Sequence, residues 1–178
     1  MYWPRGRVWG GSSSLNAMVY IRGHPLDYDT WEKMGAHGWN YQNCLPYFKK
    51  AQNHELGPDD YRGGSGPLHV SRGTSGNVLH DVFLEAAQQA GHGYTADVNG
   101  FRNEGVGPFD MTINKGKRWS ASSAYLRPAL KARPDRVSIK DSVLVHKVIF
   151  ENNVAVGVEI SDGNGNVEKI YANEVSGN

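Results

Sequence analysis

The chain has 178 residues and a formal net charge of +1, because its 19 basic and 18 acidic side chains nearly balance. This balance argues against binding to nucleic acid or to a membrane surface by bulk charge. The lack of an apolar run of about 18 residues argues against a membrane-spanning helix. The single cysteine, Cys44, excludes internal disulfides and cysteine-based zinc sites, and we expect it to be a small buried thiol.

The first distinctive feature is the Gly- and Ser-rich stretch RGRVWGGSSSLN at residues 5–16, which runs directly into the apolar sequence AMVY. Gly10 and Gly11 allow positive φ angles and the close approach of backbone to a ligand. The hydroxyls of residues 12–14 can bind phosphate or cap the next segment, and the amide of Asn16 can both donate and accept. These properties suit a ligand-binding loop, and a solvated turn of the same composition remains the alternative.

Neither of two common phosphate-binding motifs fits this stretch. A Walker loop needs a Lys followed by Ser or Thr after its second Gly, and here Ser12 follows Gly11 with no Lys nearby. A Gly-x-Gly-x-x-Gly sequence between a strand and a helix, typical of dinucleotide binding, does not occur in the chain.

Two helices are predicted soon after this loop. Pro25 and Asp27 suit the start of the first helix, and Gly35 suits its end. Asn40 is a candidate N-cap for the second helix, in which Pro46 is expected to fall in an early turn.

The middle of the chain predicts a short strand near residues 68–70 and the clearest helix at residues 77–91, where apolar residues recur at helical spacing and Gly91 suits the end. A further strand is expected near the sequence FDMTI. Residues 120–134 predict a helix capped by one of its serines and interrupted or bent at Pro128.

The last third is rich in Val and Ile. Residues 136–175 are punctuated by Asn152-Asn153 and by the run SDGNGN, which predicts an antiparallel meander of three or four strands. The fold class that follows is mixed α and β: a Gly-rich loop, helices, and then a meander.

The residues alone show no catalytic constellation. None of the seven histidines has the helical spacing with an intervening Glu that a metalloprotease needs, so each is expected to be structural or solvated, His80 and His92 at the surface. There is no Gly-x-Ser-x-Gly elbow of a serine hydrolase. The five tryptophans are expected in packing, with a cation-binding aromatic box as the lesser alternative. No metal site is predicted.

The segment GRVWGGSSSLNAMVYIRGHPLDYD resembles the first signature of the glucose-methanol-choline (GMC) oxidoreductases. Its Gly6-Arg7, the Gly pair, Ser12-Ser13 and Leu15-Asn16 fall in the order of that signature, as do Tyr20, Gly23 and Asp29. The similarity continues in GWNYQNCLPYFKKAQNHELG, GKRWSASSAYLRPAL and VIFENNVAVGVE, and it extends over nearly the whole chain.

The resemblance implies part of a GMC-type FAD-binding domain together with part of an antiparallel-sheet substrate domain, incomplete at both ends. Residues 1–70 would hold the flavin-lining loop and helices of the FAD domain, residues 71–134 elements of the substrate domain, and residues 135–178 a meander of the FAD domain.

The resemblance also implies FAD as the cofactor. Members that attach FAD covalently do so through a His directly before the signature Asn. This chain has Leu15 there, so FAD is expected to be noncovalent. The meander would contribute a backbone contact under the adenine end. The residues that the family pattern places against FAD are Val8, Gly11, Ser12, Asn16, Ala17, Met18, Val19 and, in the meander, Val145.

Within the family, the segments are most similar to members that oxidise choline to betaine aldehyde in animal mitochondria, by hydride transfer to flavin N5. The resemblance therefore implies a small-molecule alcohol substrate, choline first, and a mitochondrial location with possible inner-membrane association. The alternatives are a different alcohol as the substrate, or a module with no catalytic function.

The family's dinucleotide-binding unit is expected before residue 1, and its base His with a His or Asn partner after residue 178. No catalytic residue is therefore assigned within the chain. We expect an internal piece of the enzyme that is inactive alone, does not retain FAD, and exposes apolar surface.

Overall fold

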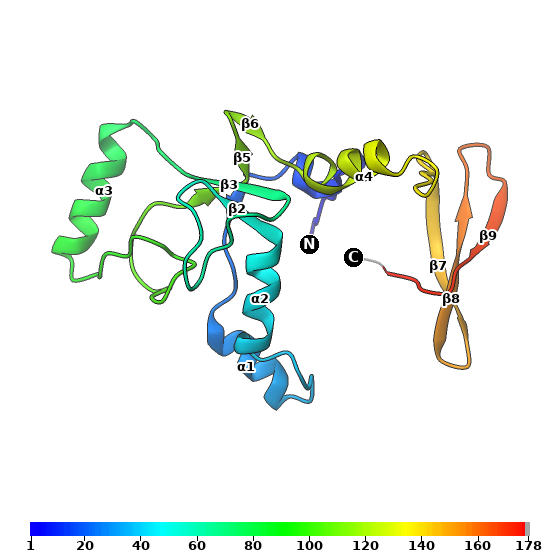
Figure 1. The fold of residues 1–178 in the computed structure, drawn as a ribbon, viewed down its shortest axis with the longest axis horizontal. Coiled ribbons are helices and arrows are strands. Elements are labelled where there is room, and N and C mark those ends of the chain that lie inside the picture. The colour runs from blue at the N-terminus through cyan, green and yellow to red at the C-terminus, as the bar shows by residue number, and fades with distance from the viewer. Residues whose placement is uncertain (177–178) are drawn as a thin grey trace. The chain divides into compact units, whose positions relative to one another are not determined.

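The computed structural model describes residues 1–176 and divides into two compact units, Met1–Ala132 and a second unit that begins at Arg133 (Figure 1). Each unit is described by itself. The mixed α/β fold predicted from the sequence is confirmed. The assignment of residues 1–70, 71–134 and 135–178 to an FAD domain and a substrate domain stays a prediction.

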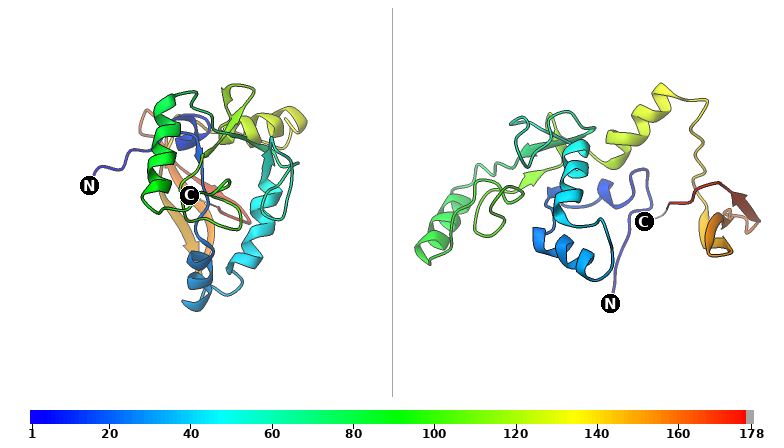
Figure 2. Two further views of the ribbon diagram at one scale, coloured as in Figure 1. Left: turned by 90° about the vertical axis from the view of Figure 1, so that its left-hand side faces the viewer. Right: turned by 60° about the horizontal axis from the view of Figure 1, so that its bottom comes forward.

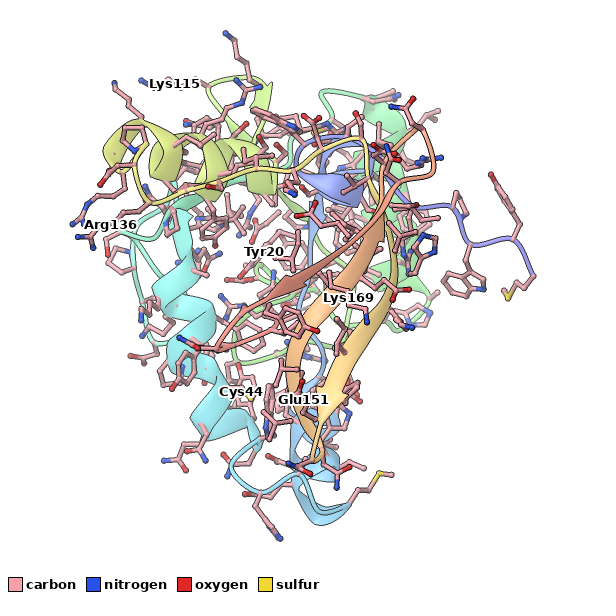
Figure 3. The ribbon with its side chains drawn as sticks, turned by 90° about the vertical axis from the view of Figure 1, so that its right-hand side faces the viewer. Tyr20, Cys44, Lys115, Arg136, Glu151 and Lys169 are labelled. Atoms are coloured by element: carbon pink, nitrogen blue, oxygen red, sulfur yellow. The ribbon has the colours of Figure 1, made fainter. Side chains whose placement is uncertain are left out.

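A four-stranded sheet organises the first unit, with the strand order β1-β4-β3-β2. Strands β2 and β3 are parallel, and the other two pairs are antiparallel. A separate hairpin, β5-β6, directly follows β4, and its turn is closed by Lys115 with φ 48° and Gly116 with φ 75° (Figure 3). The strands are β1 Val19–Tyr20, β2 Gln52–His54, β3 Leu68–Arg72, β4 Asp110–Met111, β5 Ile113–Asn114 and β6 Lys117–Arg118.

The two early helices begin where the sequence predicts, and the first also ends where predicted. Helix α1, Pro25–Lys33, begins after His24, whose Nδ1 accepts from the Leu26 N–H at 3.1 Å, and it is followed by Gly35 with φ 107°. Helix α2, Tyr41–Ala51, is capped by Asn40, whose Oδ1 accepts from the Asn43 N–H at 2.9 Å.

Pro46 lies in the second turn of α2, an early turn as expected, so the carbonyl of Gln42 lacks the N–H donor that any other residue would supply. One expectation for α2 is corrected. Cys44 is partly exposed rather than buried, because α2 packs against α1 on one side only, and its Sγ lies 3.5 Å from the Trp39 carbonyl oxygen.

Helix α3, Val78–Gln89, forms within the predicted range of residues 77–91 and is followed by Gly91 with φ 92°. Its apolar residues are nevertheless exposed, among them Val82 and Phe83. Figures 1 and 2 show α3 standing apart from α1 and α2 in all views. Helical spacing therefore predicted the helix, although no core covers its apolar face within the described residues.

The predicted helix at residues 120–134 forms as one turn of π-helix, η2 Ser122–Leu126, followed by α4 Arg127–Ala132. The predicted serine cap is present, since Ser120 Oγ accepts from the Ser123 N–H at 3.3 Å. The change of helix type comes just before Pro128, which agrees with the predicted interruption.

The interior of the first unit is more polar than apolar. Its buried apolar side chains are Tyr28, Val70, Val98 and Ala124, and its buried polar side chains include Gln52, His54, Asn99 and Asp110. Such groups are stable inside only when they are paired. Arg22 pairs with two of them, because its guanidinium donates to Gln52 Oε1 at 2.8 Å and its backbone N–H donates to Asn99 Oδ1 at 2.8 Å.

The second unit contains the predicted meander. It has three antiparallel strands, β7 Leu144–Glu151, β8 Val154–Ser161 and β9 Val167–Tyr171. Asn152 and Asn153 both have positive φ, at 49° and 65°, as expected for a two-residue hairpin turn. Glu151 ends β7 next to this turn, and Lys169 lies on β9 (Figure 3).

No helix among residues 1–176 is both long and apolar enough to cross a membrane.

Candidate functional site

The Gly- and Ser-rich stretch forms a built loop rather than a flexible linker. Residues Gly11–Ser14 make a short 3₁₀ helix, η1, and Gly10 and Gly11 precede and begin it with φ 92° and 55°. The Gly11 N–H donates to the Val8 carbonyl at 2.8 Å, and the Leu15 N–H donates to the Ser12 carbonyl at 3.1 Å. Positive φ at both glycines is what this tight path requires, as the sequence predicted.

The three serine hydroxyls hold the loop's own backbone. Ser12 Oγ accepts from the Gly6 N–H at 3.1 Å, and Ser14 Oγ donates to the Trp9 carbonyl at 2.7 Å. Ser13 Oγ donates to the Gly10 carbonyl. The hydroxyls therefore bind backbone that precedes them, and the expected capping of the next segment is not observed, because the short helix begins after Gly10 without a side-chain cap.

The end of the loop, residues 16–19, turns sharply before it enters β1. Asn16 Oδ1 accepts from the Met18 N–H at 3.0 Å. Met18 has φ 65°, a left-handed conformation that is uncommon for any residue other than glycine. Ala17 and Val19 are exposed on either side of it, so several backbone and side-chain groups of this turn remain accessible.

Replacing Met18 by Val should loosen this turn more than replacing it by Gly. A β-branched residue is strongly disfavoured in the left-handed region, where an L-residue costs about 1–2 kcal/mol, whereas glycine adopts it freely. Hydrogen exchange of the amides of residues 16–19 measures the difference. Equal exchange in Met18→Val and Met18→Gly would show that the positive φ is not required.

A distant segment, residues 110–121, supports the loop along its length. The Thr112 N–H donates to the Met18 carbonyl at 2.7 Å, and the Ala121 N–H donates to Ser13 Oγ at 2.8 Å. Between these two, Arg118 on β6 donates to the loop through Nη1. The sequence did not single out these residues, because their contacts cross about 100 positions of the chain and no local pattern marks them.

An open apolar hollow of about 400 Å³ adjoins the loop at Gly10. On the other side it is formed by η2 and α4, through residues that include Tyr125 and Leu126. The hollow gives a flat, apolar group a place beside the loop's backbone.

Val145, the remaining residue predicted to contact FAD, lies in the second unit. It pairs with Ile160 in β7 and β8, and the register shifts between Val145 and Lys147, as at a β-bulge. Its side chain is exposed. A bulge re-aims the backbone groups beside it, which fits the predicted role of this residue through its backbone.

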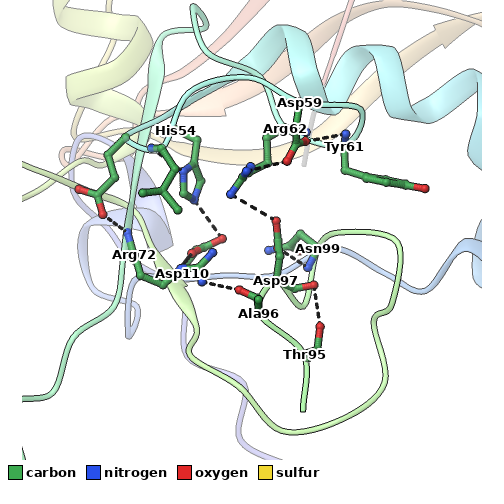
Figure 4. Close-up of polar contacts among 12 residues, drawn as sticks. His54, Asp59, Tyr61, Arg62, Arg72, Thr95, Ala96, Asp97, Asn99 and Asp110 are labelled. Atoms are coloured by element: carbon green, nitrogen blue, oxygen red, sulfur yellow. Dashed lines mark hydrogen bonds and ion pairs between the residues drawn. The ribbon is translucent and has the colours of Figure 1, made fainter. Parts of the chain in front are cut away.

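A buried ionic cluster that the sequence did not predict joins three strands of the first unit's sheet (Figure 4). Asp110 on β4 accepts from Arg72 Nε on β3 at 2.7 Å, and its other carboxylate oxygen lies 3.2 Å from His54 Nε2 on β2, close enough for an ionic contact. The side chains of His54 and Asp110 are 0% and 2% exposed. His54 Nδ1 accepts from the Leu56 N–H at 3.1 Å, so the ring proton must lie on Nε2, which faces Asp110.

The environment of Asp110 favours its charged form. Burial by itself raises the pKa of the Asp110 carboxyl, but the hydrogen bond and electrostatic interaction with His54, together with the charge of Arg72, outweigh it and hold that pKa below its usual value. The carboxylate therefore stays ionised and fixes β4, which pairs with β1 directly after the loop.

Comparison with known proteins supplies the family. The family model described as GMC oxidoreductase matches residues 1–176. The chain is 60% identical to the mitochondrial choline dehydrogenase of Mus musculus over 92% of its length and 58% identical to that of Homo sapiens over 98%. It is 49% identical to an oxygen-dependent choline dehydrogenase of Photobacterium profundum over 97% of its length.

Solved structures give the same fold. Pyridoxine 4-oxidase from Mesorbium loti superposes with a TM-score of 0.84 at 32% identity, covering 95% of this chain and 33% of that one. An FAD-dependent oxidoreductase from Chaetomium thermophilum superposes with a TM-score of 0.82 at 30% identity, covering 95% and 31%. The chain spans only 27% to 30% of the length of the three choline dehydrogenases.

Proposed function

Because this chain belongs to the GMC oxidoreductase family, we propose that it supplies the flavin-facing loop of an FAD-dependent enzyme that oxidises a small-molecule alcohol, choline. Choline is proposed as the substrate because the chain is 58–60% identical to mammalian choline dehydrogenases and only 32% identical to pyridoxine 4-oxidase. The chain spans less than a third of the length of those dehydrogenases, so the activity of the whole enzyme is itself a proposal.

The loop fits a flat ring system. A Cβ built on Gly11 would meet no atom within 4 Å, so the backbone there is open to a ligand. The apolar hollow beside Gly10 and the exposed turn at residues 16–19 offer contact surface and hydrogen-bond donors to the same neighbourhood. These features support placing Val8, Gly11, Ser12 and Asn16–Val19 against FAD.

Bound FAD supplies a hydride acceptor, flavin N5, for oxidation of the alcohol carbon. The residues of this chain would orient and hold the cofactor. Fixed backbone groups and the Asn16 amide present donors without having to reorganise, which is how a protein tunes the electronics of a flavin. No residue of the chain is assigned the removal of the hydroxyl proton.

Three finer features belong to the same proposal. Leu15 has no nucleophilic atom, so FAD is held noncovalently at this position. Val145 contacts the adenine end through its backbone. The enzyme is placed in mitochondria because its two mammalian relatives are named as mitochondrial proteins. A bacterial relative is also similar, at 49% identity, so this placement depends on the higher identity with the mammalian proteins.

Equilibrium titration of the chain with FAD, followed by quenching of flavin fluorescence, tests the cofactor. We expect weak saturable binding that is lost on gel filtration, because a loop and a meander hold only part of a dinucleotide, and we expect no displacement by NAD. FAD fluorescence that is unchanged at millimolar protein, or binding that NAD displaces equally, would contradict the proposal. A stable yellow complex after gel filtration would show that the chain binds FAD better than we expect.

A further inference from the structure

Arg118 makes a concentrated set of contacts with the loop. Its Nη1 donates to the Asn16 carbonyl at 2.8 Å, to Asn16 Oδ1 at 2.9 Å and to the Ser13 carbonyl at 3.2 Å. Arg118 lies on β6, and the neighbouring Trp119 N–H donates to the Thr112 carbonyl at 2.8 Å, so the backbone that carries it is fixed by the hairpin.

These contacts determine which way the Asn16 amide points. Its Oδ1 faces two donors, the Met18 N–H at 3.0 Å and Arg118 Nη1 at 2.9 Å. A flipped amide would place its NH₂ group against both donors, and an NH₂ group accepts no hydrogen bond. The Oδ1 atom is therefore occupied. The Nδ2 group has no protein partner among residues 1–176 and remains as the group that Asn16 can offer to a ligand.

We propose that Arg118 is a positioning residue, which locks Asn16 so that its Nδ2 donor, and not its Oδ1 acceptor, faces the cofactor. The inference rests on the proposed function for the identity of that cofactor. Flavin rings present acceptor oxygens and nitrogens along their polar edge, so a fixed donor is the complementary group. Without Arg118, Asn16 would lose the one charged partner it has among residues 1–176, and the amide could rotate.

The experiment compares Arg118→Met, Arg118→Lys and the matched control Lys115→Met, which removes an exposed charge at the tip of the same hairpin. Without ligand, Arg118→Met should speed exchange of the Met18 amide by at least about tenfold, because hydrogen bonds to a charged group are lost. Arg118→Lys should restore part of the protection, and Lys115→Met should change nothing. Unchanged exchange in Arg118→Met would overturn the proposal.

The variant Asn16→Asp tests the hydrogen-bond donor role of Asn16 separately from the order of the turn. Its carboxylate can still accept from Met18 and from Arg118, so the turn should stay protected, but the NH₂ donor is gone. Binding should weaken at least about tenfold, or beyond detection, for both FAD and riboflavin, which lacks the phosphates that an added negative charge would repel. Undiminished flavin binding by Asn16→Asp would overturn the donor role. If the unaltered chain binds no flavin, the proposed function fails, and the exchange of Arg118→Met still decides whether Arg118 positions Asn16.

Discussion

Replacing Asp110 by Asn is expected to destabilise the first unit by about 3 kcal/mol at neutral pH, the loss found when one partner of a buried ion pair is removed. The amide can accept from only one of His54 and Arg72 through its oxygen, and its NH₂ group then faces the other donor. Denaturant unfolding followed by circular dichroism measures the change. Asp60→Asn, at an exposed position in the same unit, is the matched control and should be neutral.

The same carboxylate gives the first unit a defined acid sensitivity. Because the pKa of Asp110 is lower in the folded chain than in the unfolded chain, its stabilisation is complete above the ordinary value of about 4 and is lost as the pH falls through the folded pKa. The difference in unfolding free energy between the chain and Asp110→Asn should therefore shrink below pH about 4. A difference that is constant across this range would show that the charge of Asp110 does not stabilise the fold.

Replacing Gly6 by Ala is expected to deform the loop. A Cβ at Gly6 would lie 2.4 Å from the Gly11 carbonyl oxygen and 2.8 Å from the Ser12 nitrogen, so residues 11–12 must move. Amides of the loop should then exchange faster, and flavin binding should be lost. Gly163→Ala is the control, because a Cβ there would meet nothing within 4 Å.

Gly11→Ala should produce a different result from Gly6→Ala. Its Cβ would point into open space, so the bonds of the loop should survive apart from about 1 kcal/mol for the positive φ of 55°. The same methyl would stand where we place the flavin, and binding should still be lost. If Gly11→Ala binds flavin as the unaltered chain does, the ring does not approach this part of the backbone.

Local chemistry made much of the fold predictable from sequence. The capped starts of α1 and α2, the glycine after α3 and the Asn-Asn turn of the meander each depend on a few adjacent residues. The positive φ at Gly10 and Gly11 belongs to the same group. Short-range rules suffice there because the deciding hydrogen bond or φ angle lies within four residues.

The supports of the candidate site could not be predicted in this way. Arg118 reaches Asn16 across 102 positions, and His54 meets Asp110 only because β2, β3 and β4 lie in one sheet. In the sequence, nothing distinguishes these residues from ordinary surface residues. Only strand order and register bring the partners together. Long-range pairing also determines the burial of Asn99, whose Nδ2 donates to the Tyr20 carbonyl 79 positions away.

The exposed apolar residues of α3 show a further limit of sequence periodicity. An amphipathic pattern predicts that a helix has an apolar face, but it does not identify what covers that face. In the described structure Val78, Leu79, Val82 and Phe83 remain exposed, in keeping with the apolar surface that we expected.

The most direct test of the flavin-facing loop is a titration of the isotope-labelled chain with FAD, followed residue by residue in amide NMR spectra. We expect resonance shifts that are concentrated at residues 8–19, with a second group around Val145, and that are absent when Gly11 is replaced by Ala. Shifts confined to other surfaces, or no shifts at millimolar FAD in a chain whose spectrum is that of a folded protein, would contradict the proposal.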